Sequence, residues 1–288
     1  MSFTLSTDTS CDIFRNELKA RGIEYRPLVY TIDDVPYFDE FTKDEDYKGF
    51  YDKIRAGKMP TTSQITVVEH EEYFTELCEK YDGDIVHITL SSGLSSTYAS
   101  ACKAAEAVNA EHGKRVYVVD SLAATIATRH VVDEAQSLRD RGVSAEQAVK
   151  ELENFVNHMQ TWFMPYDLMH LKRGGRVSGP SAYIGTALNI KPIINFDKYG
   201  ALAVVQKKMG AGKGITAMVD AFKRLSAKTP HKVYIASADS EFADLLLRKA
   251  KAVRPDCEFE IGWIGPVIGA HTGCNAVGLS FVSDVARS

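Results

Sequence analysis

Apolar positions along the first half of the chain alternate between short continuous runs and longer stretches with helical spacing. The runs that predict buried strands span residues 3–5, 25–31, 84–90 and 115–119. The stretches that predict amphipathic helices span residues 11–21, 42–57, 66–80, 96–112, 123–141 and 144–158. Because strands and helices alternate, we expect a mostly parallel sheet with helices on both of its faces.

After Trp162 the pattern changes, because it includes a hairpin in addition to strand–helix units. Further strands are predicted at residues 191–196, 201–207, 232–237, 258–264 and 276–282, and helices at 213–227 and 241–253. The sequence Asp-Lys-Tyr-Gly at 197–200 has the composition of a turn, so the two strands beside it form a hairpin. A hairpin combined with strand–helix units predicts a mixed sheet. We therefore expect two closely packed α/β domains, residues 1–163 and 164–288.

The composition argues against several classes of protein. The chain has 288 residues, 45% hydrophobic and 25% charged, which is ordinary for a globular protein large enough for two cores. Its net charge of −4 favours neither nucleic acid nor an anionic membrane surface. The five cysteines form no CxxC pair, so neither a disulfide framework nor a structural zinc site is expected. The absence of a signal-peptide pattern and of any long apolar run predicts a cytoplasmic protein without membrane-spanning helices.

Two hydroxyl-rich segments stand where ligands bind in α/β proteins, beside strand ends and helix starts. Residues 61–64 (TTSQ) precede a predicted helix, and residues 91–98 (SSGLSSTY) join a predicted strand to a helix. Hydroxyls in such places commonly cap the first amides of the helix. The same amides and hydroxyls can also bind an anion. Both interpretations are open for Thr62 and Ser95.

Two further segments offer polar groups. Residues 172–176 (KRGGR) form a basic, glycine-rich loop, which is either plain surface or a place for a phosphate paired with arginine. In the glycine-rich loop at residues 265–273 (GPVIGAHTG), His271 stands where a ligand can approach, although an isolated histidine is more often structural. Residues 210–214 (GAGKG) invite comparison with a P-loop, but Lys207 stands where the pattern needs glycine and Gly214 where it needs Ser or Thr. No HExxH zinc pattern occurs either.

Taken in order, these segments resemble the DegV family of fatty-acid-binding proteins over essentially the whole chain. The matching motifs are STDTSCD at 6–12, TSQ at 62–64, LSSTY at 94–98, LKRGGR at 171–176 and GPVIGAHTG at 265–273. The resemblance implies two α/β domains with a ligand tunnel between them. The chain departs from the family pattern at Ile65, at Ser96 and at Cys274-Asn275, which leaves the motif hydroxyls and His271 in place.

The resemblance also implies a ligand and a partner. A long-chain fatty acid would place its carboxylate at Thr62 and Ser95, with Ser96 beside them and His271 nearby, and its tail in the tunnel. A separate acyl kinase would phosphorylate the presented carboxylate for phospholipid synthesis, and Arg176 would contact the phosphate or the kinase. Neither a cofactor nor a metal is implied. Since burial of each CH₂ stabilises by about 0.8 kcal/mol, we expect the tail to set affinity and the head group to set orientation.

An enzyme is the main alternative. Residues 93–97 (GLSST) resemble the nucleophile elbow G-x-S-x-G of serine hydrolases, although Thr97 replaces the last glycine. A serine hydrolase or acyltransferase would use Ser95 as nucleophile and His271 as base. A phosphotransferase and a DNA-binding regulator have less support, because the chain lacks a P-loop and a basic stripe. The expected close packing of the two domains favours a monomer.

Overall fold

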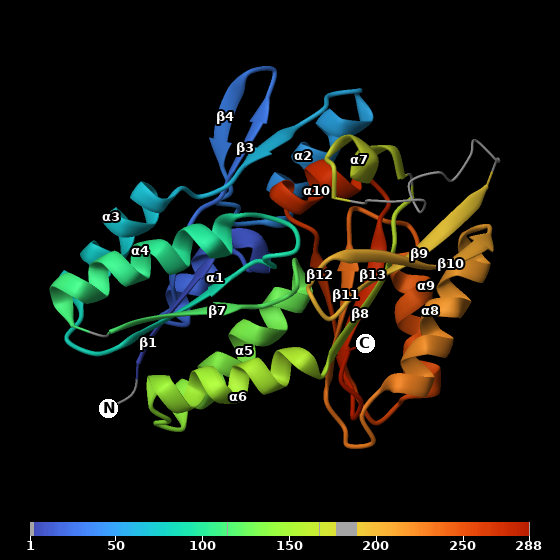
Figure 1. The fold of residues 1–288 in the computed structure, drawn as a ribbon. Coiled ribbons are helices and arrows are strands. Elements are labelled where there is room, and N and C mark those ends of the chain that lie inside the picture. Colours follow the sequence, from blue (N-terminus) through green and yellow to red (C-terminus); the bar gives the residue numbers. More distant parts are fainter. Residues whose placement is uncertain (1–2, 114, 167, 177–188, 288) are drawn as a thin grey trace.

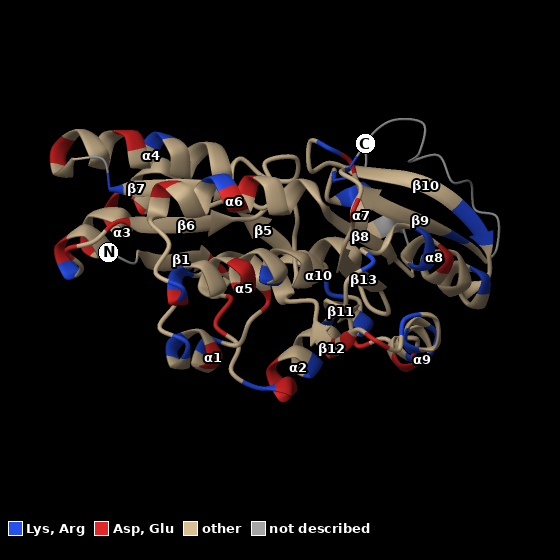
Figure 2. Ribbon diagram, turned by 90° about the horizontal axis from the view of Figure 1, so that it is seen from below, with Lys and Arg blue, Asp and Glu red and all other residues tan. Residues whose placement is uncertain are grey.

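The computed structural model describes residues 3–113, 115–166, 168–176 and 189–287, and it contains three sheets. Figure 1 shows the first α/β unit on the left, a larger sheet on the right, and the hairpin of β3 (Val29–Ile32) and β4 (Val35–Phe38) projecting at the top. Within the described ranges, no helix is both long and apolar enough to cross a membrane. Basic and acidic residues are interspersed over the helices (Figure 2).

The first sheet is fully parallel, as the alternation of strands and helices predicts. Its strands in order are β2 (Glu24–Arg26), β1 (Thr4–Asp8), β6 (Ile85–Thr89) and β7 (Val116–Asp120). One face packs on α3 (Val67–Lys80) and α4 (Thr97–His112), and the other on α5 (Ile126–Asp140) and α6 (Ala145–Asn157) (Figure 1). The carboxyl ends of β1, β6 and β7 point toward the second sheet, so loops after these strands lie in the centre of the molecule.

The second sheet has six strands and is mixed, which confirms the predicted class. Its strands in order are β10 (Leu202–Met209), β9 (Ile190–Phe196), β8 (Met159–Met164), β13 (Val277–Val282), β11 (Lys232–Ser237) and β12 (Glu258–Trp263). Only the β11–β12 pair of this sheet is parallel among the described pairings. One face packs on α8 (Ala211–Leu225) and α9 (Ala243–Val253), and α5 packs on the other face.

Strand β8 is absent from the sequence prediction, and its whole length belongs to the second sheet. The domain boundary expected after residue 163 therefore falls inside a strand, and the division of the chain at that point stays a prediction. Helix α5 contacts β1 and β6 of the first sheet and β11 and β13 of the second. This shared helix ties the two units together and forms one wall of the space between them.

A small antiparallel sheet was not predicted. It consists of β4 (Val35–Phe38), β3 (Val29–Ile32) and β5 (Thr61–Ser63). The sequence predicted one strand over residues 25–31, but that segment forms β2 and β3 in two different sheets. Pro27 stands between them, and a proline has no N–H to continue a ladder of hydrogen bonds. Strand β5 of this small sheet carries Thr62, one of the residues predicted to bind a ligand.

Three helices differ from the prediction. The helix expected over residues 11–21 begins only at α1 (Arg15–Ala20), because Asp12 has a φ of 53° and ends a short 3₁₀ turn at Thr9–Cys11. The segment 265–273, expected as a loop, contains α10 (Pro266–Thr272). The basic loop was expected at 172–176, but its first two residues form the last turn of α7 (Leu168–Arg173). Helix α2 (Asp44–Arg55) packs against α10.

Candidate functional site

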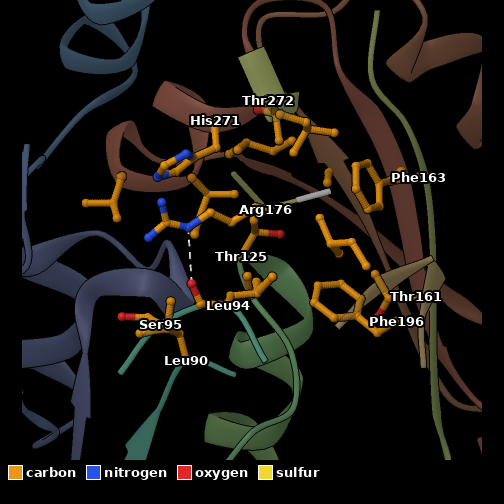
Figure 3. A pocket seen from close by; sticks show the side chains of 18 of the residues that line it. Leu90, Leu94, Ser95, Thr125, Thr161, Phe163, Arg176, Phe196, His271 and Thr272 are labelled. Atoms are coloured by element: carbon orange, nitrogen blue, oxygen red, sulfur yellow. Dashed lines mark hydrogen bonds between the residues drawn. The ribbon is translucent and has the colours of Figure 1, made fainter. Parts of the chain in front are cut away.

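A central cavity lies between the carboxyl end of the parallel sheet and the inner face of the mixed sheet (Figure 3). Its empty volume is about 850 Å³, part of it open to solvent. Most of its wall is apolar and includes the side chains of Leu28, Leu90, Phe163, Phe196, Ile264 and Val267. An apolar cavity with few polar groups, at the strand ends of an α/β sheet, is typical of a small-molecule site.

One end of the central cavity carries a polar mouth. The mouth is lined by Thr62, Gln64, Ser92, Leu94, Ser95, Ser96 and Arg176. Thr62, Ser95 and Arg176 line the central cavity as well, so the mouth adjoins the cavity. The cavity therefore has an apolar interior and a polar end where exposed side chains meet solvent.

Thr62 and His271 meet at this end of the cavity. Thr62 comes from β5 and His271 from α10, and the Oγ1–Nε2 distance is 2.9 Å. Burial lowers the pKa of His271 to about 4, and the charges of Arg176 and His170 act in the same direction. The imidazole is therefore neutral at pH 7 and offers one hydrogen-bond donor and one acceptor.

Close backbone approach fixes the position of the His271 ring. A Cβ atom added at Gly174 would lie closer than 3.0 Å to Nδ1 of His271, so only a glycine fits there without movement of the ring. A Cβ atom at Gly273 would lie 2.6 Å from the ring of His170, so helices α7 and α10 approach each other through two glycine–histidine contacts. The glycines of these two motifs thus serve close packing around the histidine.

Ser95 lies in the turn between β6 and α4 and is half-buried. Its Oγ accepts a hydrogen bond from the backbone N–H of Thr97 at 3.2 Å and shares another with Thr97 Oγ1 at 2.9 Å. The hydroxyl therefore supports the start of α4 and also lines the cavity, so the two interpretations open from the sequence are compatible. Ser96 is exposed and lines the polar mouth but not the central cavity.

Comparison with known proteins shows what this arrangement resembles. The sequence model of the DegV family, described as an uncharacterised protein family, matches residues 2–284. The chain belongs to the DegV family. It is 31% identical to the protein DegV of Bacillus subtilis over 283 residues, which cover 97% of this chain and 98% of the relative. It is equally similar, at 31% identity over 98% of both chains, to a DegV domain-containing protein of Clostridium perfringens.

Solved structures of other DegV proteins share the fold. The crystal structure of DegV from Bacillus subtilis, a fatty acid binding protein, superimposes with a TM-score of 0.84 at 29% identity and covers 99% of this chain and 100% of that chain. A DegV family protein from Thermus thermophilus, also described by its fatty acid binding, gives a TM-score of 0.85 at 28% identity, with 98% and 100% covered. The architecture of this chain is therefore that of the DegV fold.

Arg176 connects the basic motif of this DegV protein to the Ser95 turn. Its Nε donates to the carbonyl of Leu94 at 3.2 Å, and its Nη1 donates to the carbonyl of Gly174 (Figure 3). The guanidinium lines both the central cavity and the polar mouth. It therefore brings a positive charge to the same end of the cavity as the Thr62, Ser95 and His271 side chains, all of which the sequence singled out.

Sequence reasoning missed two threonines that line the cavity wall, Thr125 and Thr161. Thr125 begins α5 with a φ of 58°, which is rare for a β-branched residue, and its N–H donates to the carbonyl of Ser10 at 2.7 Å. Nothing in the local sequence signals that these two hydroxyls line one cavity, because they come from two separate elements.

The motif at residues 6–12 contributes a buried carboxyl, Asp8, that holds the backbone next to the cavity. Asp8 accepts hydrogen bonds from the backbone N–H groups of Leu90 and Ser10, both at 2.9 Å. Burial raises the pKa of Asp8 to about 6, and these hydrogen bonds oppose the rise. Because Leu90 lines the cavity and precedes the Ser95 turn, Asp8 holds the segment that positions Ser95.

Proposed function

We propose that this chain is a monomeric cytoplasmic protein that binds one long-chain fatty acid. The carboxylate would lie at the polar mouth, bonded by Thr62 and Ser95 near His271, and the tail would fill the central cavity. The observation that carries this proposal is the shape of the site, a single apolar cavity with hydroxyls, a neutral imidazole and a guanidinium at one end. Two DegV structures at 28% and 29% identity belong to proteins described as binding fatty acids, which supports the same ligand class.

The head-group end suits a carboxylate that must react further. Each hydrogen bond from a hydroxyl or imidazole to a carboxylate contributes roughly 1.5–3 kcal/mol. Such neutral donors orient the carboxylate without the full countercharge of a bidentate arginine, so its oxygens keep their nucleophilic character. We therefore propose that the protein presents the acid to a separate acyl kinase at the polar mouth. Arg176 stands at the rim of that mouth, where it would contact the transferred phosphate or the kinase.

The alternative is a serine hydrolase or acyltransferase. That chemistry needs a hydrogen bond from Ser95 to a histidine base. In the described part of the chain, the Ser95 hydroxyl bonds Thr97 and the His271 Nε2 bonds Thr62. These pairings favour binding over nucleophilic attack. Covalent labelling of Ser95 by a fluorophosphonate, lost in Ser95→Ala, would favour the enzyme instead.

Native mass spectrometry of the purified protein tests the binding function. We expect a non-covalent adduct with the mass of a fatty acid, released intact by denaturation and identified after extraction. Protein stripped of lipid should take up one equivalent from a mixed panel of fatty acids. A protein that purifies empty and binds no member of the panel would refute the proposal. Adding a bacterial acyl kinase and ATP to the loaded protein then tests presentation, with acyl phosphate as the product.

A further inference from the structure

The end of the central cavity away from the polar mouth contains a hydroxyl among apolar side chains. Figure 3 shows Thr161, Phe163 and Phe196 on the side of the cavity opposite to Ser95 and His271. Thr161 lies on β8 and is 9% exposed. A hydroxyl in such a place influences a ligand only through the hydrogen-bonding capacity that the protein itself leaves unused.

The Thr161 hydroxyl begins a chain of hydrogen bonds that leads away from the cavity. Thr161 Oγ1 donates to Ser280 Oγ at 3.4 Å, across the β8–β13 pairing. Ser280 Oγ lies 3.2 Å from Nδ1 of His130 on α5. The other ring nitrogen of His130, Nε2, lies 3.0 Å from the carbonyl oxygen of Lys232. Ser280 is fully buried and His130 is 5% exposed, so water does not replace these partners.

The last member of the chain fixes the direction of every proton. A carbonyl oxygen only accepts, so Nε2 of His130 carries the ring proton. Burial lowers the pKa of His130 to about 4, which keeps the ring neutral at pH 7 and makes Nδ1 an acceptor. Ser280 must therefore donate to Nδ1, and its oxygen accepts the proton of Thr161. Thr161 has no proton left for a ligand, but its oxygen can still accept a hydrogen bond, and the side chain lines the cavity.

We propose that this end of the cavity is an acceptor site for fatty acids that carry a hydroxyl group at or near the end of the tail. The inference rests on the proposed function, since it concerns the other end of the same ligand. The tail O–H donates to Thr161 Oγ1, which replaces the hydrogen bond that the hydroxyl loses on leaving water. In an all-apolar cavity the same hydroxyl would be left without a partner, which costs roughly tenfold or more in affinity.

Competition binding to the lipid-free protein tests the proposal. The probes are hydroxy acids of 14, 16 and 18 carbons, hydroxylated at the last or next-to-last carbon, each compared with the unsubstituted acid of equal length. We expect at least one hydroxy acid to bind the wild-type protein within about threefold of its parent acid. If every hydroxy acid binds more than about tenfold more weakly than its parent, Thr161 does not accept a hydrogen bond from the tail, and the proposal is wrong.

Substitution of Thr161 supplies the second readout. Thr161→Val removes the acceptor at nearly constant volume, so the affinity for the hydroxy acid relative to its parent should fall about tenfold. Thr161→Ser should retain the ratio, and Thr272→Val, which removes another cavity hydroxyl outside the chain of hydrogen bonds, should leave it unchanged. An unchanged ratio in Thr161→Val would overturn the proposal. If the wild-type protein binds no parent acid at all, the proposed function fails and this inference fails with it.

Discussion

Substitution of Gly174 by alanine tests how the site holds His271. The added Cβ would lie closer than 3.0 Å to Nδ1 of the ring, whereas ordinary contacts of this kind begin at 3.4 Å. The ring would have to move by roughly 1 Å or rotate, because van der Waals repulsion is steep at such distances. The 2.9 Å hydrogen bond from Nε2 to Thr62 cannot survive a shift of that size. We therefore expect Gly174→Ala to displace the histidine rather than to unfold the protein.

The magnitude follows from the hydrogen bond that is lost. The displaced ring no longer holds Thr62, whose hydroxyl bonds the carboxylate in the proposed function. Roughly 1.5–3 kcal/mol is then lost, so Kd for hexadecanoate should rise about tenfold to a hundredfold. His271→Ala removes the same interaction directly. The double variant should therefore bind no more weakly than His271→Ala alone, since both changes abolish one contact.

Isothermal titration calorimetry on lipid-free protein measures all four Kd values of this cycle. Gly212→Ala is the matched control, because a Cβ at Gly212 on α8 meets no atom within 4 Å. That variant should keep the wild-type Kd. Additive effects of Gly174→Ala and His271→Ala would show that Gly174 acts on binding by another route. An unchanged Kd in Gly174→Ala would refute the reasoning outright.

Four further perturbations have defined outcomes. Ser95→Ala should raise Kd for hexadecanoate about tenfold without abolishing binding, because the tail supplies most of the affinity; complete loss in calorimetry would contradict this. Ala236→Leu adds an isopropyl group to the cavity wall and should shorten the preferred acyl chain in mass spectra of bound lipid, whereas an unchanged chain length would place the tail elsewhere. Thr66→Ala breaks the capping box of α3 and should lower the free energy of unfolding in urea by about 1 kcal/mol while Kd stays constant. Because the pKa of His271 is lowered to about 4, the unfolded chain binds a proton between pH 6.5 and 4 that the folded chain does not, so this residue makes stability fall as pH falls through that window. Its ring proton shifts in NMR should stay constant from pH 8 to 5.5, and a midpoint near 6.5 would show an exposed ring.

Most of the longer strands and helices were predictable, because hydrophobic period and helix caps are local properties. The capping box of Thr66 and Glu69 begins α3 as predicted, with Glu69 N–H bonded to Thr66 Oγ1 at 3.3 Å. The small sheet escaped prediction for a non-local reason. Its strand β5 has three residues, two of them exposed, so it carries no hydrophobic pattern of its own. Only pairing with β3 makes it a strand.

The prediction of a loop at residues 265–273 was wrong for a different reason, which concerns its glycines. The segment 265–273 was expected to be a loop because it contains three glycines, yet it forms α10. A Cβ at Gly269 would lie 2.7 Å from the hydroxyl of Tyr51, so this glycine permits α2 and α10 to approach closely. Sequence alone does not distinguish a glycine that bends the chain from one that makes room for a neighbour. The same holds for Gly174 beside His271.

The two ends of the cavity also differed in how far the sequence could predict them. At the mouth, Thr62 and His271 are 209 positions apart, and only the resemblance to a family brought them together. At the other end, Thr161, Ser280 and His130 come from β8, β13 and α5, and no motif contains them. A tail-end site depends on register between strands, which hydrophobic pattern does not specify. This is the part of the ligand site where the structure adds most.

The neutrality of His271 links the geometry of the mouth to the proposed presentation of the acid. A protonated imidazole against the carboxylate would form an ion pair and withdraw charge from the oxygen that must attack a phosphoryl donor. Burial prevents this by lowering the pKa of His271 to about 4, and Gly174 keeps the ring in the buried position. Affinity can then come from the tail while reactivity stays at the head. A variant that lets solvent reach His271 should therefore bind fatty acid near pH 6 but present it less well to a kinase.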